Sequence, residues 1–469
     1  MTGRTSDEPA PEHRGRRVAE LRFLVPSLFG FAFTRAYYDV VAAYMASFIP
    51  GMPWAGQDLV VMGMVPAFLL CVVMARRLLP LSSMRGAGAL SCAFMTAGTA
   101  LLALAPAFSE TKAPFAIMGA LVAGLGVGVS ILLWAELQSC WNSFQIALYV
   151  SGAFFVGSFL GWLMLGMSEP QRLVAMLVLP ALSWACLGTG RAHVAEADLP
   201  GGFSGGLQFP WKLVVALGVY ELVLGVRQSS VSFSDGALTV GVLASSAALF
   251  LVIYFLSHRF DFTLLFRTPF VLMSCGLLAT LVSMSSDSLA ADMLVSIGYA
   301  LMFLVLTILL CDVAHRLHVS AALLCSIQEL VMLANLAGHG AGAALASGTH
   351  ASSPAILVGL AVLIIVASMT LLTEREYARW GAALFGMGEL AGAQEARDDL
   401  GRRCEELADA HALSPREREV FRLLAAGEGA ADIERALCIA EGTLKSHTRR
   451  IYRKLGIHSR EELEAMVRA

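Results

Sequence analysis

Twelve runs of mostly apolar residues follow one another along this chain, and they restrict its fold more than any other feature. A helix that crosses lipid needs about 20 such residues, because each backbone polar group must find its hydrogen-bond partner within the helix. The sequence therefore predicts an all-α, polytopic membrane bundle. The runs lie near residues 21–49, 58–79, 86–106, 114–135, 143–166, 171–190, 211–231, 236–257, 268–285, 288–311, 320–346 and 353–373.

Charged residues divide the chain into regions. They make up 15% of the whole chain, against about 25% in soluble domains, and they are sparse between residues 23 and 373. This distribution predicts a cytoplasmic tail at 1–20 and a membrane domain at 21–373. A charged helical linker is expected at 374–412, and a separate polar domain at 413–469.

Lys and Arg in the loops set the expected orientation, because cytoplasmic loops carry the excess of positive charge. With the N-terminus inside, the outer loops hold only Lys112, Arg172 and Arg227, and all other loop Lys and Arg residues lie inside. An even number of spans returns the C-terminus to the same side. We therefore expect a multi-pass protein of the cell (inner) membrane with both termini in the cytoplasm.

The longest polar break, residues 191–206, divides the spans six and six. A weak repeat links the halves: "SILLWAE" at 130–136 parallels "TILLCD" at 307–312, and Gly161 and Gly338 share the same offset. This arrangement resembles the major facilitator superfamily (MFS) fold, whose halves are related repeats. The loop "ARRLLPLSSMRG" lacks the Gly and Asp of that family's usual motif between spans two and three, which argues against active transport.

Small residues recur at intervals of four within several spans, a spacing that lets helices pack closely. These residues are Ala120, Gly124 and Gly128, Gly157 and Gly161, and Gly338 and Gly342.

Ionisable residues within lipid are costly, so they are candidates for function. We interpret four of them as lining a central ligand cavity, with structural pairing between helices as the alternative. They are Arg35, Asp39, Glu221 and Glu329. Because Arg35 and Asp39 are four residues apart on one helix, they can neutralise each other. Three further residues near span ends, Glu136, Arg227 and Asp312, are expected to be solvated.

No pattern of catalytic chemistry occurs in the sequence. It contains no nucleophile elbow, no Walker loop and no His-Glu-x-x-His spacing. We therefore expect no enzyme activity, no catalytic residue, and no metal or cofactor.

From Leu413 the sequence predicts a small helical domain. Ser414 is placed to cap a helix, Pro415 to occupy its first position, and Glu417 to complete a capping box. A short second helix is expected around Ile433 and Leu437, and a third from about Thr443 to Leu455. Two helices joined by a tight turn, the second strongly basic, are typical of the helix-turn-helix motif.

The third helix has two distinct faces. Leu444, Thr448, Ile451 and Leu455 have the spacing of a buried stripe. The other face predicts DNA contacts, with a merely solvated basic face as the alternative. The base-reading candidates are Lys445, Ser446 and Arg449. The phosphate-binding candidates are Thr443, Arg450, Arg453 and Lys454.

These residues closely resemble the LuxR-type DNA-binding domain. The matching elements are "LSPREREV", Gly427, Ile433, Leu437, Ile439, "GTLKSH" and "RKLGIHSR". The resemblance implies a cytoplasmic four-helix domain that binds double-stranded DNA as a homodimer, at a pseudo-palindromic operator. It also implies that the last helix, "REELEAMV", forms the dimer contact. Ala440 replaces the Ser that usually precedes the recognition helix, and residues 429–434 also depart from the family pattern.

Together these patterns predict a bacterial one-component transcriptional regulator that is embedded in membrane lipid. Its membrane domain would bind a small molecule or sense a membrane signal, and thereby bias the dimerisation or release of the DNA-binding domain. Two alternatives are an MFS-like transporter with a regulatory DNA-binding tail, and a membrane scaffold whose tail holds a partner protein.

Overall fold

The computed structural model describes residues 25–46, 48, 55–84, 86–108, 112–141, 143–194, 209–230, 233, 236–256, 263–283, 289–347, 353–371, 403–404, 407–411, 413–425, 441–457, 462–463 and 466. The chain forms two compact units, Met1–Phe385 and Gly386–Ala469. The predicted N-terminal tail and almost all of the predicted linker lie outside the described residues.

The first unit has a long helical segment at each of the twelve predicted spans, which confirms the all-α membrane fold. The first half holds α2 (Val25–Ala46), α3 (Ala55–Val73), α5 (Ala87–Leu104), α6 (Lys112–Gln138), α7 (Ser143–Leu165) and α8 (Glu169–Arg191). The second half holds α9 (Trp211–Ser230), α10 (Ala237–Leu256), α11 (Thr263–Ser283), α12 (Leu289–Leu317), α13 (Ala321–Leu330), α14 (Leu333–Ser347) and α15 (Ser353–Leu371).

Nine helices in the described part of the chain are long and apolar enough to cross a membrane. Helices α2 and α9 are not among them, and both carry ionisable residues. Large apolar side chains such as Val73, Phe255 and Val282 are exposed on the outside of the bundle. Such a surface suits lipid, since hydrocarbon offers no hydrogen bonds and needs no polar covering.

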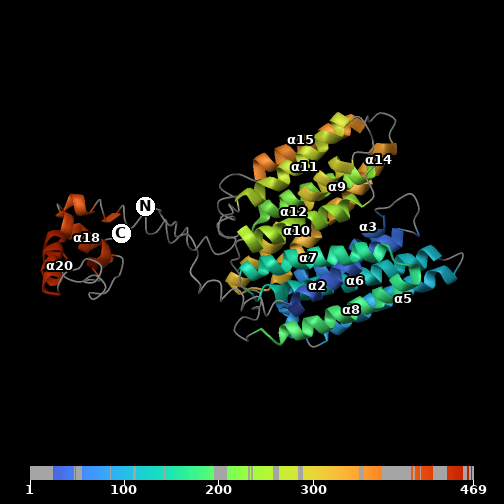
Figure 1. The fold of residues 1–469 in the computed structure, drawn as a ribbon, viewed down its shortest axis with the longest axis horizontal. Coiled ribbons are helices and arrows are strands. Elements are labelled where there is room, and N and C mark those ends of the chain that lie inside the picture. The colour runs from blue at the N-terminus through green and yellow to red at the C-terminus, as the bar shows by residue number, and fades with distance from the viewer. Residues whose placement is uncertain are drawn as a thin grey trace, which may run out of the picture. The chain divides into compact units, whose positions relative to one another are not determined.

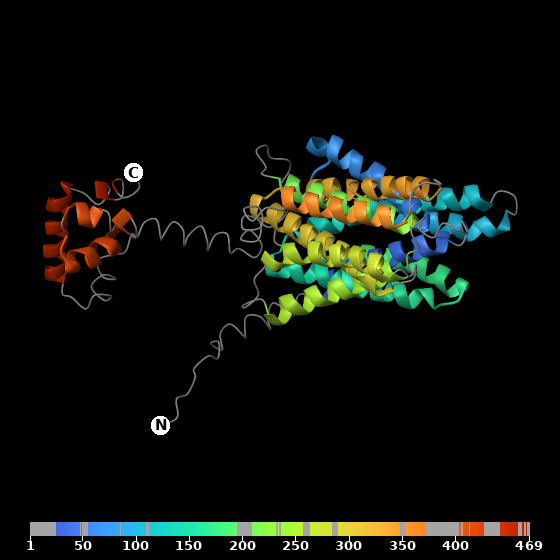
Figure 2. The same cartoon turned by 90° about the horizontal axis from the view of Figure 1, so that it is seen from above.

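The two halves repeat one packing pattern. In the first half α2 packs on α7 and α8, α5 on α6 and α8, and α3 on α6. In the second half α9 packs on α14 and α15, α11 on α12 and α15, and α10 on α12. Figure 1 shows α5, α6 and α8 on one side of the bundle and α9, α11 and α15 on the other, and Figure 2 shows the long helices running beside one another. The six-plus-six prediction is therefore confirmed.

Glycines allow the closest of these helix contacts, as the sequence predicted. A Cβ atom at Gly124 would overlap the backbone oxygen of Val60 on α3, and one at Gly157 would overlap α2. In the second half, a Cβ at Gly338 would overlap the backbone oxygen of Leu222 on α9. The contact between α7 and α2 thus has its counterpart between α14 and α9.

The eleventh span is interrupted, whereas the sequence predicted one continuous run over 320–346. Helix α13 ends at Leu330 and α14 begins at Leu333. At the break, the N–H groups of Val331 and Met332 donate to the carbonyls of Gln328 and Glu329, three residues back. This tight turn places a discontinuity directly after Glu329.

Glu136, Arg227 and Asp312 correct the sequence prediction, because all three are buried rather than solvated. Arg227 forms a 2.5 Å ion pair with Asp292 of α12, and both side chains are fully enclosed. Asp312 pairs with Arg316 at 3.0 Å. Packing of neighbouring elements over these span ends excludes the water that the sequence alone suggested.

Glu136 is enclosed by a loop and by the opposite half. Its carboxylate accepts the N–H groups of Leu81 (2.9 Å) and Ser82 (2.7 Å), which belong to the short helix η1 (Leu81–Ser83). It also accepts the Ser320 hydroxyl, next to α13, at 2.5 Å. One carboxylate therefore joins the two halves of the bundle.

The second unit has its own apolar core between α18 (Pro415–Ala425) and α20 (Glu441–Leu455). The predicted capping box is confirmed: the Ser414 N–H donates to Glu417 Oε2 at 2.8 Å, and the Glu417 N–H donates to Ser414 Oγ at 3.4 Å. The helix expected around Ile433 and Leu437 lies outside the described residues. Of the expected last helix, only residues 462, 463 and 466 are described.

Candidate nucleic-acid interface and membrane cavity

Helix α20 buries the stripe that its sequence predicted. Leu444, Ile451 and Leu455 are at most 4% exposed, and they pack against Val420 and Phe421 of α18. The Thr448 hydroxyl donates to the Leu444 carbonyl at 3.0 Å, so it needs no partner outside the helix. These contacts fix which face of α20 is directed outward.

The outward face of α20 carries the predicted DNA contacts. All of them are exposed: Thr443, Lys445, Ser446, Arg449, Arg450, Arg453 and Lys454. The helix has no acidic residue after Glu441. Its exposed face is therefore positively charged, and this is the electrostatic footprint that a phosphate backbone requires.

Lys454 has a second partner that the sequence did not suggest. Its ammonium lies 2.7 Å from Glu417 Oε2, whose side chain is only 5% exposed. Burial opposes ionisation of Glu417, but hydrogen bonds from Lys454 and Ser414 outweigh it and lower the pKa of this carboxyl from 4.5 to about 2. Lys454 thus holds α20 against α18, in addition to any contact with phosphate.

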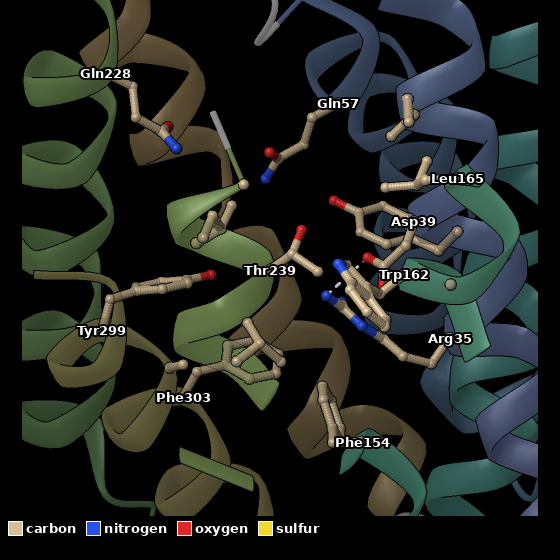
Figure 3. Close-up of a pocket in the computed structure, with 18 of the residues that line it drawn as sticks. Arg35, Asp39, Gln57, Phe154, Trp162, Leu165, Gln228, Thr239, Tyr299 and Phe303 are labelled. Atoms are coloured by element: carbon tan, nitrogen blue, oxygen red, sulfur yellow. Dashed lines mark ion pairs between the residues drawn. The ribbon is translucent and has the colours of Figure 1, made fainter. Parts of the chain in front are cut away.

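A cavity of about 530 Å³ lies between the halves of the membrane domain. Residues of α2, α3 and α7 line one side, and residues of α9, α10 and α12 line the other. Figure 3 shows Arg35, Asp39 and Trp162 on one wall and Tyr299 and Phe303 opposite them. The volume falls within the range of about 300–1,000 Å³ that is typical of small-molecule sites.

Arg35 and Asp39 form the predicted intrahelical ion pair, at 2.9 Å. The guanidinium of Arg35 also lies over two aromatic rings, 5.0 Å from the centroid of Tyr38 and 5.5 Å from that of Phe154. Arg35 is therefore held by one carboxylate and two π faces at the wall of the cavity.

The other two predicted ligand residues belong to the same group. Glu329 lines a second chamber of about 40 Å³, which shares Arg35 and Tyr38 with the larger cavity. Glu221 accepts the hydroxyl of Tyr299 at 2.9 Å, and Tyr299 lines the larger cavity. Arg35 and Asp39 line the larger cavity directly. The structure therefore brings the four together around one space.

A polar cluster that the sequence did not predict joins three helices. His339 Nδ1 lies 2.8 Å from Asp58 Oδ1, and its Nε2 lies 2.8 Å from Gln228 Oε1. Asp58 and His339 are buried, and they belong to opposite halves. The three residues lie in three different spans, so only the depth of His339 in an apolar run could have signalled a buried partner.

The halves also meet at residues that follow α6 and at the end of α12. His315 Nδ1 lies 2.8 Å from the Ser139 carbonyl, and the Arg316 guanidinium donates to Ser143 Oγ at 3.3 Å. With the Glu136–Ser320 hydrogen bond, these contacts join the halves at the end where η1 lies. The cavity between them is lined instead by Gln57, Leu165 and Gln228, close to the opposite helix ends.

Comparisons with known proteins agree with both parts of the chain. Residues 411–467 match the family of bacterial regulatory proteins of the luxR family (GerE). A stretch of 63 residues is 40% identical to YhjB of Escherichia coli (strain K12), which is named as an HTH-type transcriptional regulator. That match covers 13% of this chain and 32% of YhjB, so the chain spans about a third of this curated relative.

The membrane domain is similar to solved transporter structures. One is a bacterial homologue of the iron transporter ferroportin in an outward-facing state, with a TM-score of 0.54, 12% identity, and coverage of 77% of this chain and 99% of that one. Another is the MFS proton:xylose symporter XylE bound to 6-bromo-6-deoxy-D-glucose, with a TM-score of 0.53, 11% identity, and coverage of 75% and 94%. At such low identity these likenesses show the fold alone.

Proposed function

We propose that this chain, a LuxR-type helix-turn-helix domain joined to an MFS-like membrane domain, is a membrane-bound one-component transcriptional regulator. Its DNA-binding domain spans 413–469, and its sensor spans 21–373, with the segment 374–412 as a helical linker. The observation that carries this proposal is the exposed basic face of α20, which lies opposite a buried stripe within the luxR match. The sensor binds a small molecule, and binding changes how the C-terminal domain engages DNA.

The residues of α20 divide into two roles. Lys445, Ser446 and Arg449 lie in the N-terminal part of the helix, which reaches base edges in this motif, so they read sequence. Arg450, Arg453 and Lys454 contact phosphates, and Thr443 offers its hydroxyl and backbone N–H to a phosphate at the helix start. The domain binds as a homodimer, so its half-sites are related by a two-fold axis.

The protein lies in the cytoplasmic membrane with both termini inside, where its C-terminal domain meets DNA. The excess of Lys and Arg in the inner loops supports this orientation. A reporter that is active only in the cytoplasm should work when fused after Ala469, and one that is active only outside should work in the 107–113 loop. Reversed results would refute both the topology and the DNA-binding role.

Ligand sensing is assigned to Arg35, Asp39, Glu221 and Glu329. Glu221→Gln and Glu329→Gln should each alter the response to inducing conditions, because each removes an ionisable carboxyl group at or next to the cavity. The isolated fragment 394–469 should bind DNA in every case. An unchanged dose response in both variants would assign the two carboxyl groups to structure instead.

The experiment that tests the whole proposal is genome-wide mapping of the DNA bound by the intact protein. A regulator should occupy a small set of sites that contain a two-fold related motif, and the neighbouring genes should indicate the class of ligand. Recovery of no enriched sites would contradict the proposal.

A transporter with a regulatory DNA-binding tail is the second candidate, and the cavity between the repeats favours it, since transporters bind substrates at that interface. Proteoliposomes separate the two candidates. A regulator should bind its ligand without accumulating it, whereas a transporter should move the ligand across the membrane.

A further inference from the structure

The charges around the central cavity are not balanced. Among the described residues of this group, Arg35 is the one cation, and it stands with three carboxyl groups: Asp39 and Glu329, which line the two cavities, and Glu221, which lies behind Tyr299. Asp39 already pairs directly with Arg35, at 2.9 Å. Several ionised carboxyl groups with one cation are costly in a site surrounded by lipid, unless they take up protons or a further positive charge arrives.

Glu329 is the group that most lacks a partner. Its side chain is 7% exposed and lines the smaller chamber. Within the described part of the chain its carboxylate accepts no hydrogen bond, and Arg35 influences it only through space. Glu221, by contrast, accepts the Tyr299 hydroxyl. A buried carboxylate without a donor marks the position at which a ligand donor would be most stabilising.

The backbone next to Glu329 also favours a positively charged ligand. Helix α13 ends at Leu330, so the negative end of its dipole lies at this position. Met332, in the break that follows, lines both chambers. In transporters the interrupted ends of such helices coordinate cations, and here the interruption adds to the preference for positive charge.

The walls of the larger cavity suit a cation that has an apolar body. Aromatic rings line it from both halves, including Tyr38, Phe154, Trp162, Tyr299 and Phe303. Two of these rings already hold the guanidinium of Arg35 by their faces. Aromatic faces attract cations more strongly where water is excluded, whereas an anion placed against Arg35 would also face Asp39 and Glu329.

The sizes of the two chambers indicate which part of such a ligand each chamber can hold. The chamber at Glu329 holds about 40 Å³, more than the roughly 10–15 Å³ that a cavity needs to hold one water molecule. A group of the size of an ammonium fits there. The larger cavity, of about 530 Å³, has room for the body of the molecule.

We propose that the membrane domain binds an organic cation, with a small ammonium group against Glu329 and an apolar, preferably aromatic, body in the larger cavity. This proposal rests on the proposed function, because it names the chemical class of the ligand for the same sensor. It adds that the chain discriminates ligands by charge.

Three probes of one shape and different charge test the proposal: 2-phenylethylamine, 2-phenylethanol and phenylacetate. Equilibrium binding is measured on the full chain in lipid nanodiscs, at a pH where the amine is protonated. The amine should bind at least about tenfold more tightly than the alcohol, and phenylacetate should bind most weakly. Equal binding of amine and alcohol, preference for phenylacetate, or no binding of the amine at millimolar concentration would overturn the proposal.

Matched variants test whether Glu329 is responsible for the preference for the amine over the alcohol. Glu329→Gln should remove most of the tenfold difference between amine and alcohol, whereas Glu329→Asp should keep the amine preferred. The control is Glu169→Gln, which removes the same charge from an exposed position at the start of α8 and should leave the ratio unchanged. A ratio that is unaffected by Glu329→Gln, in a variant that still binds the alcohol normally, would also overturn the proposal.

The test of ligand preference and the test of DNA binding can fail independently of each other. A chain that prefers the amine but binds no DNA would refute the regulator and leave the cation site intact. A chain that binds DNA without any preference among the three probes would do the reverse.

Discussion

The ammonium of Lys454 on α20 lies 2.7 Å from the Glu417 carboxylate in the first turn of α18. The same carboxylate oxygen accepts the backbone N–H of Ser414. One side chain therefore completes the cap of α18 and ties α20 to it. The orientation of the basic face of α20 consequently depends on Glu417, a buried residue of α18.

Replacing Glu417 should destabilise the C-terminal domain. Glu417→Gln removes the ion pair and weakens the cap, and it should lower the free energy of unfolding of fragment 394–469 by about 1–3 kcal/mol at pH 7. Urea unfolding followed by circular dichroism measures the change. Glu419→Gln is the control, because its partner Arg416 is exposed and the pair should contribute less than about 1 kcal/mol.

The contribution of Glu417 should also depend on pH. Its pKa is lowered from 4.5 to about 2 in the folded domain. A lowered pKa means that the stabilisation is complete above 4.5 and is lost as the pH falls from 4.5 towards 2. The difference in stability between the parent fragment and Glu417→Gln should therefore shrink over this window. A difference that stays constant from pH 7 to pH 2 would contradict the ion pair.

The residues of α20 that we propose to read bases and those that we propose to bind phosphates should respond differently to mutation. Lys445→Ala or Arg449→Ala should relax the sequence preference at one or two positions of each half-site, at about 1–3 kcal/mol for each lost bidentate contact. Arg453→Ala should weaken binding about equally on all sequences, because phosphates carry no sequence information. Binding selection with randomised half-sites measures both effects. Relaxed preference in Arg453→Ala alone would reverse the assignment.

Two glycines on α14 should respond oppositely to the same substitution. A Cβ at Gly338 would overlap the backbone of α9, whereas a Cβ at Gly340 would meet nothing within 4 Å. Gly338→Ala should therefore separate α14 from α9 and lower the thermal unfolding temperature of the purified protein. Gly340→Ala should leave it unchanged or raise it slightly, since Ala favours helix more than Gly does. Equal effects of the two substitutions would contradict the packing of these helices.

Local patterns predicted the features that depend on one segment at a time. Run length gave the twelve helical segments, and the spacing of Leu444, Ile451 and Leu455 gave the buried face of α20. The capping box was also visible, since Ser414 and Glu417 lie within one turn. In each case the residues that interact are close in the sequence, so their geometry follows from the helix itself.

Partners that are distant in the sequence were not predictable. The sequence suggested that Glu136 is solvated, because it lies at a span end. It is instead enclosed by η1 of its own half and by Ser320 of the other half. His339 and Asp58 are 281 residues apart. Their pairing depends on how the halves pack, and no single span carries that information. The grouping of Arg35, Asp39, Glu221 and Glu329 was proposed from depth alone, and their ligand-binding role stays a prediction.

The most direct test of the central claim is DNA binding by the full chain in lipid nanodiscs, with sites recovered from the genome-wide map. The parent protein should bind these sites with an affinity that falls steeply as salt rises, because Lys and Arg displace condensed counterions. The triple variant Lys445→Glu, Arg449→Glu and Arg453→Glu should lose binding while it keeps its helical circular dichroism spectrum. If the triple variant binds the same sites as tightly as the parent, α20 is not the recognition helix, and the account of this protein as a membrane-bound regulator is contradicted.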